Sequence, residues 1–230
     1  MLNDLKQKVY DANQLLPAYK LITFTWGNVS GIDREKGIVA IKPSGVEYDV
    51  LQPEDIVLVS LLEGTVIEGK MNPSSDTATH LELYRHFPNI GGVVHTHSQW
   101  ATIWSQAGKE INAYGTTHAD YFNDKIPCTR TMTDAEIKDN YEQNTGKVII
   151  ETFKDIKPED MPAVLVKSHG PFTWGKDPLE AVHHAVILEQ LAMMAFYTEQ
   201  LAGGAVPMQE TLHNKHFNRK HGENAYYGQK

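Results

Sequence analysis

Two histidines, His95 and His97, stand one residue apart at the end of the short apolar run GGVVHTH. In a β-strand the side chains at positions i and i+2 share a face, so both imidazoles can turn toward one ion. Such a pair is equally compatible with ordinary hydrogen bonding inside a fold. His169 follows the apolar run PAVLV and would add a third imidazole at a strand end. Three histidines predict an open, zinc-type site that keeps a position for water or substrate.

Two aspartates could take part in the same chemistry. Asp76, in PSSD, offers a carboxylate that could be a fourth, displaceable metal ligand. At the start of a predicted helix, the same carboxylate would instead be stabilised by the helix dipole. Asp120, in the polar run GTTHADYF, could be a general acid or base, although a loop aspartate is more often a cap or a solvated charge. Both interpretations of each aspartate stay open at this level.

Three short polar turns are suited to binding a phosphate group. Their small residues let backbone N–H groups approach an anion, and their hydroxyls add donors. Each turn alone is more often only a turn, and neither nucleotide pattern, GxxxxGK(S/T) or GxGxxG, occurs in the chain. The candidate residues are Gly27 and Asn28 in WGNVS, Lys42, Ser44 and Gly45 in KPSG, and Ser74 and Ser75 in PSSD.

Alternating strands and helices must position these residues. Runs rich in β-branched residues predict strands in GIVAIKPSG, DIVLVSLLEGTVIEG, GGVVHTH and PAVLVKSHG. Helices are predicted in SSDTATHLELYRHF, in TDAEIKDNYEQN with Thr133 as its N-cap, and in the long segment that follows Asp177. There Asp177 is the expected cap, Pro178 fits the first helical position, Glu180 is expected to complete a capping box, and Gly203 is the expected end. The interleaving predicts a layered α/β domain, and the hairpin-like runs between residues 38 and 67 argue against a purely parallel sheet.

Composition limits the class of protein. The 230 residues are 41% hydrophobic and contain no linker or repeat, which predicts one domain over residues 1–230. The net charge of −8 argues against a nucleic-acid or anionic-membrane partner. No apolar run approaches the roughly 20 residues of a membrane span, and the N-terminal segment has helical spacing rather than the apolar core of a signal peptide. Cys128 is the single cysteine, which leaves no internal disulfide or cysteine zinc cluster, and we expect a cytoplasmic protein.

Seven motifs, taken in order, resemble the class II aldolase/epimerase family along essentially the whole chain, and within it the epimerases. They are TWGNVS, IKPSGV, PSSDTATH, VVHTHS, GTTHADYF, SHGPFTWGK and KHGENAYYGQ. The resemblance implies a three-layer α/β/α sandwich around a mostly antiparallel sheet. It also implies a cyclic homotetramer whose sites lie between neighbouring subunits.

The resemblance also implies roles for the candidate residues. A zinc ion in each subunit, for which manganese or cobalt could substitute, would be held by Asp76, His95, His97 and His169. The phosphate and substrate contacts would be those of the three polar turns. Asp120 and Tyr227 would be the proton-transfer pair, with Tyr227 reaching the site of a neighbouring subunit.

The implied reaction is metal-dependent epimerisation of L-ribulose 5-phosphate to D-xylulose 5-phosphate at C4. The C4 proton is not adjacent to the C2 carbonyl, so its removal would leave a carbanion without resonance. Retro-aldol cleavage and re-addition avoids this carbanion, and Asp120 and Tyr227 suit the two proton transfers that it requires. One alternative is a class II aldolase that releases its fragments, but such relatives typically carry glutamate where this chain has Asp76. The other is a non-enzymatic family member, which would not need Asp120 and Tyr227 together.

Overall fold

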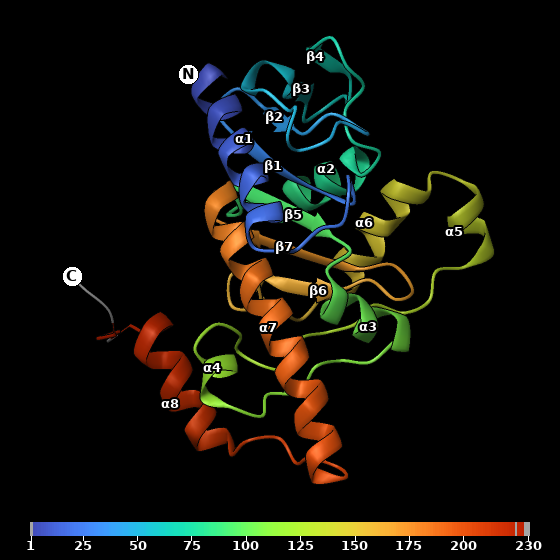
Figure 1. Cartoon of the computed structure of the whole chain (residues 1–230). Coiled ribbons are helices and arrows are strands. Elements are labelled where there is room, and N and C mark those ends of the chain that lie inside the picture. Colours follow the sequence, from blue (N-terminus) through green and yellow to red (C-terminus); the bar gives the residue numbers. More distant parts are fainter. Residues whose placement is uncertain (1, 224, 228–230) are drawn as a thin grey trace.

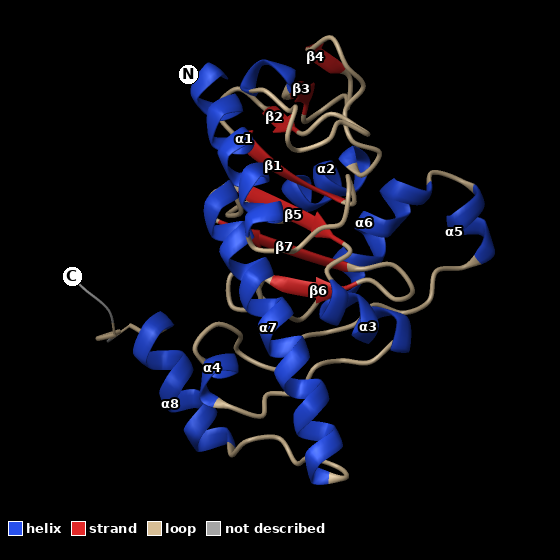
Figure 2. Ribbon diagram, viewed as in Figure 1, coloured by secondary structure: helices blue, strands red, loops and turns tan. Residues whose placement is uncertain are grey.

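A single antiparallel sheet forms the centre of the molecule, with helices on both sides (Figure 2). The structure is a computed structural model and describes residues 2–223 and 225–227. Within these residues the sheet has seven strands in the order β4-β3-β2-β1-β5-β7-β6, and each neighbouring pair is antiparallel. The strands are β1 (Gly27–Asp33), β2 (Ile38–Ile41), β3 (Val57–Ser60), β4 (Val66–Glu68), β5 (Gly92–Thr96), β6 (Ala163–Leu165) and β7 (Pro171–Gly175).

Helices cover the two faces of this sheet (Figure 1). One layer contains α1 and α7, and the opposite layer contains α2 and α6, which pack against each other. The predicted three-layer α/β/α sandwich is therefore confirmed. The helices are α1 (Leu2–Ala18), η1 (Pro53–Asp55), α2 (Thr77–His86), α3 (Gln99–Ala107), α4 (Thr116–Ala119), α5 (Asp134–Lys138), α6 (Tyr141–Thr152), α7 (Pro178–Ala202) and α8 (Glu210–His221).

Alternate residues of the inner strands face opposite cores. Val39 and Ile41 of β2 lie in the core shared with α2 and α6, whereas Ala40 between them lies in a cluster with α1. In β5, Val93 belongs to the first core and Val94 to a cluster with α1 and α7. This period of two explains why β-branched residues occupy both faces and why every residue of β5 is buried.

The ends of α7 follow the predicted signals. The Asp177 side chain accepts a hydrogen bond of 2.8 Å from the backbone N–H of Glu180. The Glu180 carboxylate accepts from the N–H of Lys176 instead of completing a capping box. Gly203 ends the helix in the left-handed conformation, with φ of 60°. This long helix is thereby fixed across the back of β5 and β7.

Two predicted segments differ from the structure. TDAEIKDNYEQN forms two helices, α5 and α6, because Asn140 has a φ of 53° and interrupts the turn between them. Gly27 and Asn28, predicted in a turn, begin β1. Neither β1 nor β7 was predicted. Among the described residues, none of the helices is both long enough and apolar enough to cross a membrane.

Candidate metal centre and active site

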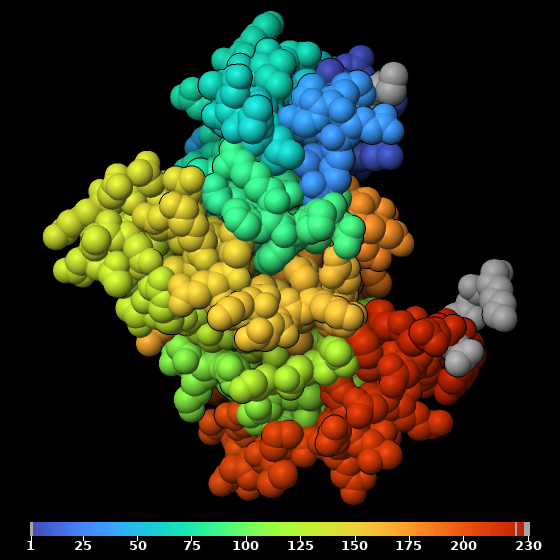
Figure 3. Space-filling model, turned by 180° about the vertical axis from the view of Figure 1, so that it is seen from behind, coloured from blue at the N-terminus to red at the C-terminus, as the bar shows by residue number. Residues whose placement is uncertain are grey.

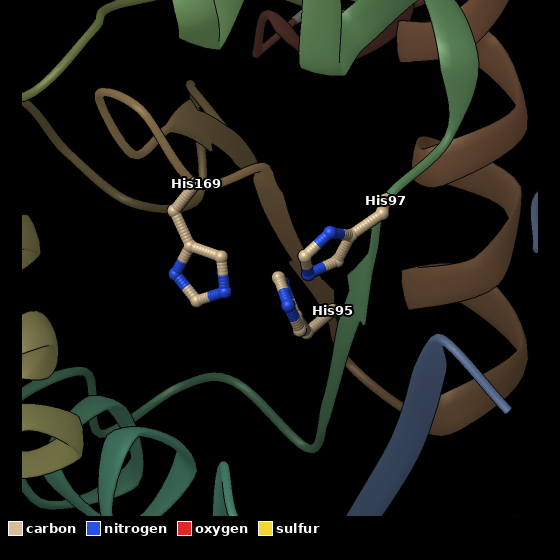
Figure 4. Close-up of side chains that lie close together, drawn as sticks. All are labelled: His95, His97 and His169. Carbon is tan, nitrogen blue, oxygen red and sulfur yellow. The ribbon is translucent and has the colours of Figure 1, made fainter.

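Three imidazole rings face one another beyond the end of β5 (Figure 4). His95 lies in β5, His97 follows one residue after the strand, and His169 comes from the turn between β6 and β7. The ring centroid of His95 is 5.0 Å from that of His97 and 4.6 Å from that of His169. One nitrogen of each ring lies within 4.8 Å of the others. The structure therefore brings together the three predicted histidines in an arrangement that fits one ion.

Backbone geometry places the turn that carries His169. Ser168 adopts the left-handed conformation, with φ of 62°, which reverses the chain between β6 and β7. A Cβ atom at Gly170 would lie 2.7 Å from the carbonyl oxygen of Thr96. Glycine is therefore required for this turn to approach the end of β5 and bring His169 to His95.

The histidines are in the form that binds metals. His95 Nδ1 donates a hydrogen bond of 3.0 Å to the carbonyl oxygen of Pro171, which leaves Nε2 free to accept an ion. His169 Nδ1 lies 3.4 Å from the hydroxyl of Tyr141. Burial lowers the pKa of His97, and it lowers that of His169 to about 3, so both rings are neutral near pH 7. Neutral imidazoles with an oriented second nitrogen fit a divalent metal ion.

Asp76 lies beside this centre rather than capping its helix. It occupies the N-cap position of α2, but its side chain makes no cap hydrogen bond. Its Oδ2 instead accepts a hydrogen bond of 2.7 Å from Asn28 Nδ2. Burial opposes ionisation, but His95, His80 and the Asn28 amide together hold the pKa of Asp76 below its usual value. The carboxylate is ionised and lines the same cavity, although it stands outside the three-histidine group.

A cavity of about 620 Å³ adjoins the three histidines and gathers the predicted phosphate turns around them. Two of these turns are held together by an isolated antiparallel β-bridge between Pro43 and Pro73. The N–H of Ser44 donates to Asn72 and the N–H of Ser74 donates to Lys42, each to a carbonyl oxygen at 3.0 Å. The predicted residues that line the cavity are Gly27, Asn28, Lys42, Ser44, Gly45, Ser74, Ser75, Asp76, His95, His97 and His169.

Two polar groups of this cavity are suited to a polar ligand. Lys42 is buried, and its ammonium lies 4.7 Å from the centroid of the Tyr48 ring. Burial lowers the pKa of Lys42 to about 8. Asn28 Oδ1 is buried and has no hydrogen-bond partner in the described part of the chain. A cation and an unpaired acceptor in one cavity match a ligand that carries both an anionic group and a hydroxyl.

Asp120 and Tyr227 do not line this cavity. Asp120 follows α4, and its carboxylate accepts hydrogen bonds from Arg219 of α8, at 3.0 Å from Nε and 2.7 Å from Nη2. His216 lies 3.2 Å from the same carboxylate. Partial burial opposes ionisation, but these hydrogen bonds hold the pKa of Asp120 below its usual range. The Tyr227 ring lies 4.5 Å from the Arg219 guanidinium and is 57% exposed.

The predicted proton-transfer pair therefore belongs to one surface of one chain, joined by Arg219. Helices α4 and α8 lie beyond the β6 edge of the sheet (Figure 1), and α8 lies on the side away from the protrusion formed by α5 and α6 (Figure 3). Within one chain both side chains thus contact Arg219, and the contribution of Tyr227 to the site of a neighbouring subunit stays a prediction. Arg219 was missed in the sequence because its partner Asp120 is 99 residues earlier in the chain.

Three further residues near the cavity were missed. Tyr141 and Glu142, at the start of α6, line it beside His169. Their signal was Asn140, which tolerates a positive φ and so could begin a new helix. His80 is fully buried, and its ring interacts electrostatically with Asp76 and His95. It stands one helical turn after Asp76, a spacing that could have marked it.

Residues 7–196 match the family model described as the class II Aldolase and Adducin N-terminal domain. The chain belongs to the class II aldolase family. It is 57% identical over 229 residues to L-ribulose-5-phosphate 4-epimerase UlaF of Salmonella paratyphi A, with 100% of both chains covered. The same figures hold for the protein of that name from Salmonella typhi. The predicted family is therefore confirmed.

Solved structures share the fold. An L-fuculose 1-phosphate aldolase superposes with a TM-score of 0.79 at 24% identity, covering 94% of this chain and 95% of that one. The L-fuculose-1-phosphate aldolase of Thermus thermophilus gives a TM-score of 0.70 at 26% identity, covering 89% and 100%. The class II aldolase fold is thus common to proteins that are named for different activities, and the site must decide between these activities.

Proposed function

We propose that this member of the class II aldolase family is an L-ribulose-5-phosphate 4-epimerase. Such an enzyme converts L-ribulose 5-phosphate to D-xylulose 5-phosphate. The observation that carries the proposal is the cavity in which three converging histidines meet the polar turns and Lys42. Such a cavity suits a sugar whose oxygens face the histidines while its phosphate lies against the turns. Relatives that match over their full length and are named L-ribulose-5-phosphate 4-epimerase support the choice of reaction.

The proposed metal is zinc, held by His95, His97, His169 and Asp76, with manganese or cobalt as substitutes. Imidazole nitrogens with one carboxylate in an open site are a donor set that zinc commonly takes. When bound, the ion supplies Lewis acidity toward the oxygens of the sugar. The hydrogen bond from His95 Nδ1 to the carbonyl oxygen of Pro171 orients His95 for this task. Metal-binding histidines are usually oriented by such a contact at their second nitrogen.

The phosphate end has a separate task. Cleavage of the C3–C4 bond leaves glycolaldehyde phosphate as a fragment, which must turn over and be attacked on its other face. Lys42 and the turns around Ser44 and Ser75 would hold its phosphate during that rotation. Charge-assisted hydrogen bonds retain the fragment, so cleavage ends in epimerisation rather than in release.

Proton transfer is proposed to come from a neighbouring copy in a homotetramer. In one chain, Asp120 and Tyr227 lie outside the cavity on a surface that includes α8. A second copy that presents this surface to the cavity would supply both groups together. The ionised Asp120, held by Arg219, would take the C4 hydroxyl proton, and Tyr227 would return a proton from the opposite side.

The reaction can be tested directly. Zinc-loaded protein is incubated with L-ribulose 5-phosphate, and the products are identified by NMR. We expect D-xylulose 5-phosphate to accumulate until the two sugars reach equilibrium. Accumulation of dihydroxyacetone and glycolaldehyde phosphate would instead show an aldolase, and an unchanged substrate would show a non-enzymatic family member.

Protonation of Lys42 should make binding of the substrate phosphate depend on pH. Its protonated form predominates below its pKa of about 8, so kcat/KM should fall as the pH rises through that value. Lys42→Arg keeps its charge at all these pH values and should move this decline upward. Lys42→Met should raise KM by about 10- to 100-fold, the range of a lost charged hydrogen bond. Superimposable pH profiles for the unchanged protein and Lys42→Arg would rule out this role.

A further inference from the structure

Helix α3 begins directly after the metal-binding end of β5, and a carboxylate from another helix lies at its start. His97 is two residues before Gln99, the first residue of α3. Glu189 belongs to α7, and only 7% of its surface is exposed. Its Oε1 accepts a hydrogen bond of 2.8 Å from the backbone N–H of Trp100, and its Oε2 accepts one of 3.0 Å from the N–H of Ala101. Glu189 thus joins α7 to the first turn of α3.

The Glu189 carboxylate takes the place of an N-cap for α3. The first N–H groups of a helix have no partner inside that helix. Ser98, at the N-cap position, makes no side-chain cap hydrogen bond. Ala101 is fully buried, so its N–H would lose its acceptor without Glu189, and an unpaired buried donor costs free energy. The helix dipole also favours a negative charge at this end. Removal of the carboxylate should therefore loosen the start of α3.

Helix α3 also contacts the turn that carries His169. Near the end of α3, the carbonyl oxygen of Ser105 accepts a hydrogen bond of 2.9 Å from the backbone N–H of Ser168. Ser168 directly precedes His169 and has the left-handed conformation that reverses the chain. The two ends of α3 are therefore tied to two different histidines of the metal centre. The chain runs from His97 into the first turn of the helix, and its last turn holds the residue before His169. A shift of α3 would change the separation of the two rings.

Helix α7 supports α3 along its length. Trp104 Nε1 donates a hydrogen bond of 2.9 Å to the carbonyl oxygen of Ala192, three residues after Glu189. The 25 residues of α7 also pack against β5 and β7. Helix α3 is thus attached to α7 through both a backbone carbonyl oxygen and a carboxylate. The carboxylate contact is the nearer of the two to His97 along the chain, and a substitution in α7 can remove it without altering α3.

We propose that Glu189 is a positioning residue that fixes α3 against α7 and thereby sets the placement of His97 relative to His169. Glu189 does not line the cavity, so its effect passes through the histidines. His97 depends most on this support, because it is exposed and follows β5 rather than lying within the strand. The inference rests on the proposed function only in taking these histidines as metal ligands. It does not depend on which sugar is bound.

Two measurements on the metal site test this role: zinc affinity, by competition with a chromophoric chelator, and the visible spectrum of bound Co²⁺. Glu189→Leu leaves the N–H groups of Trp100 and Ala101 without their acceptor. It should weaken zinc binding by about tenfold or more, as losses of outer contacts of a metal site usually do. The absorption bands of Co²⁺ should shift in the same variant, because they depend on the geometry of the ligands. Glu189→Gln keeps one acceptor oxygen and should weaken zinc binding by about two- to fivefold.

A second glutamate of α7 provides the matched control. Glu199 Oε1 accepts a hydrogen bond of 2.6 Å from Tyr114 Oη rather than from α3. Glu199→Leu makes the same chemical change in the same helix and should leave the zinc affinity and the Co²⁺ spectrum unchanged. Circular dichroism establishes that each variant is folded and gives its melting temperature. A purely structural role of Glu189 would lower that temperature without moving either metal measurement.

Two results would overturn the proposal. One is an unchanged zinc affinity and Co²⁺ spectrum in folded Glu189→Leu, and the other is an equal loss of affinity in Glu199→Leu. If Glu189→Leu does not fold, Glu189→Gln decides the question, and an unchanged zinc affinity in that variant would equally overturn the proposal.

The metal measurements need no substrate, so the two proposals can fail separately. Epimerisation by the unchanged protein together with unaffected metal binding in Glu189→Leu would overturn the role of Glu189 alone. Weakened zinc binding in that variant, without formation of D-xylulose 5-phosphate by the unchanged protein, would overturn the proposed reaction alone.

Discussion

His97→Asn is expected to remove the bound metal ion and to slow epimerisation by at least about a thousandfold, because the ion contributes several kcal/mol of transition-state stabilisation. The fold should persist, since His97 is exposed and lies outside the three hydrophobic clusters. Metal content per chain, circular dichroism and the initial rate with L-ribulose 5-phosphate check the three parts of this prediction.

A surface histidine provides the matched control for that variant. His86, near the C-terminal end of α2, is exposed and hydrogen-bonds to the carbonyl oxygen of Glu82. His86→Asn makes the same chemical change away from the cavity and should leave metal content and rate unchanged. A metal-free His97→Asn protein that turned over at the normal rate would refute the assignment of the metal centre.

Mixing two inactive variants should restore activity if the site is shared between copies. His97→Asn disables the cavity of a chain but leaves its Asp120 and Tyr227 intact, whereas Tyr227→Phe does the opposite. At random 1:1 assembly, about a quarter of the sites in a cyclic oligomer would combine an intact cavity with an intact neighbouring surface. We therefore expect about a quarter of the unmixed wild-type rate, measured after subunit exchange has been verified by mass spectrometry.

A second mixture separates this arrangement from other shared sites. Asp120→Asn and Tyr227→Phe alter the same surface, which Arg219 joins within one chain. No neighbouring copy in their mixture then supplies both groups, so this mixture should stay inactive. Recovery of activity here, or none in the first mixture, would contradict a site in which one copy supplies Asp120 and Tyr227 together.

Local patterns in the sequence were enough to predict several elements. The runs of β-branched residues in β2, β3 and β5 indicate strands by themselves. Helix α7 is capped by Asp177 and Gly203, as its sequence predicts. By contrast, β1 has the sequence GNVSGID, which lacks a strong strand signal. It is a strand because β2 and β5 pair with it on both sides, which is a tertiary effect.

The candidate site was likewise predictable in part from local sequence and in part only from the tertiary fold. His95 and His97 are adjacent by strand geometry alone, and the cavity collects the predicted turns around them. The resemblance to a family supplied the candidates that spacing does not mark. Neither source could place Asp120 against Arg219, because that contact depends on how α8 packs on α4. The orientation of Asp76 toward Asn28 likewise depends on the tertiary fold.

The most direct test of the central claim is epimerisation of L-ribulose 5-phosphate by the zinc-loaded protein in D₂O, followed by NMR of the product. Cleavage and re-addition at the C3–C4 bond never breaks the C4–H bond. The account therefore predicts D-xylulose 5-phosphate that retains protium at C4. Absence of this product, or deuterium at its C4 position, would contradict the account.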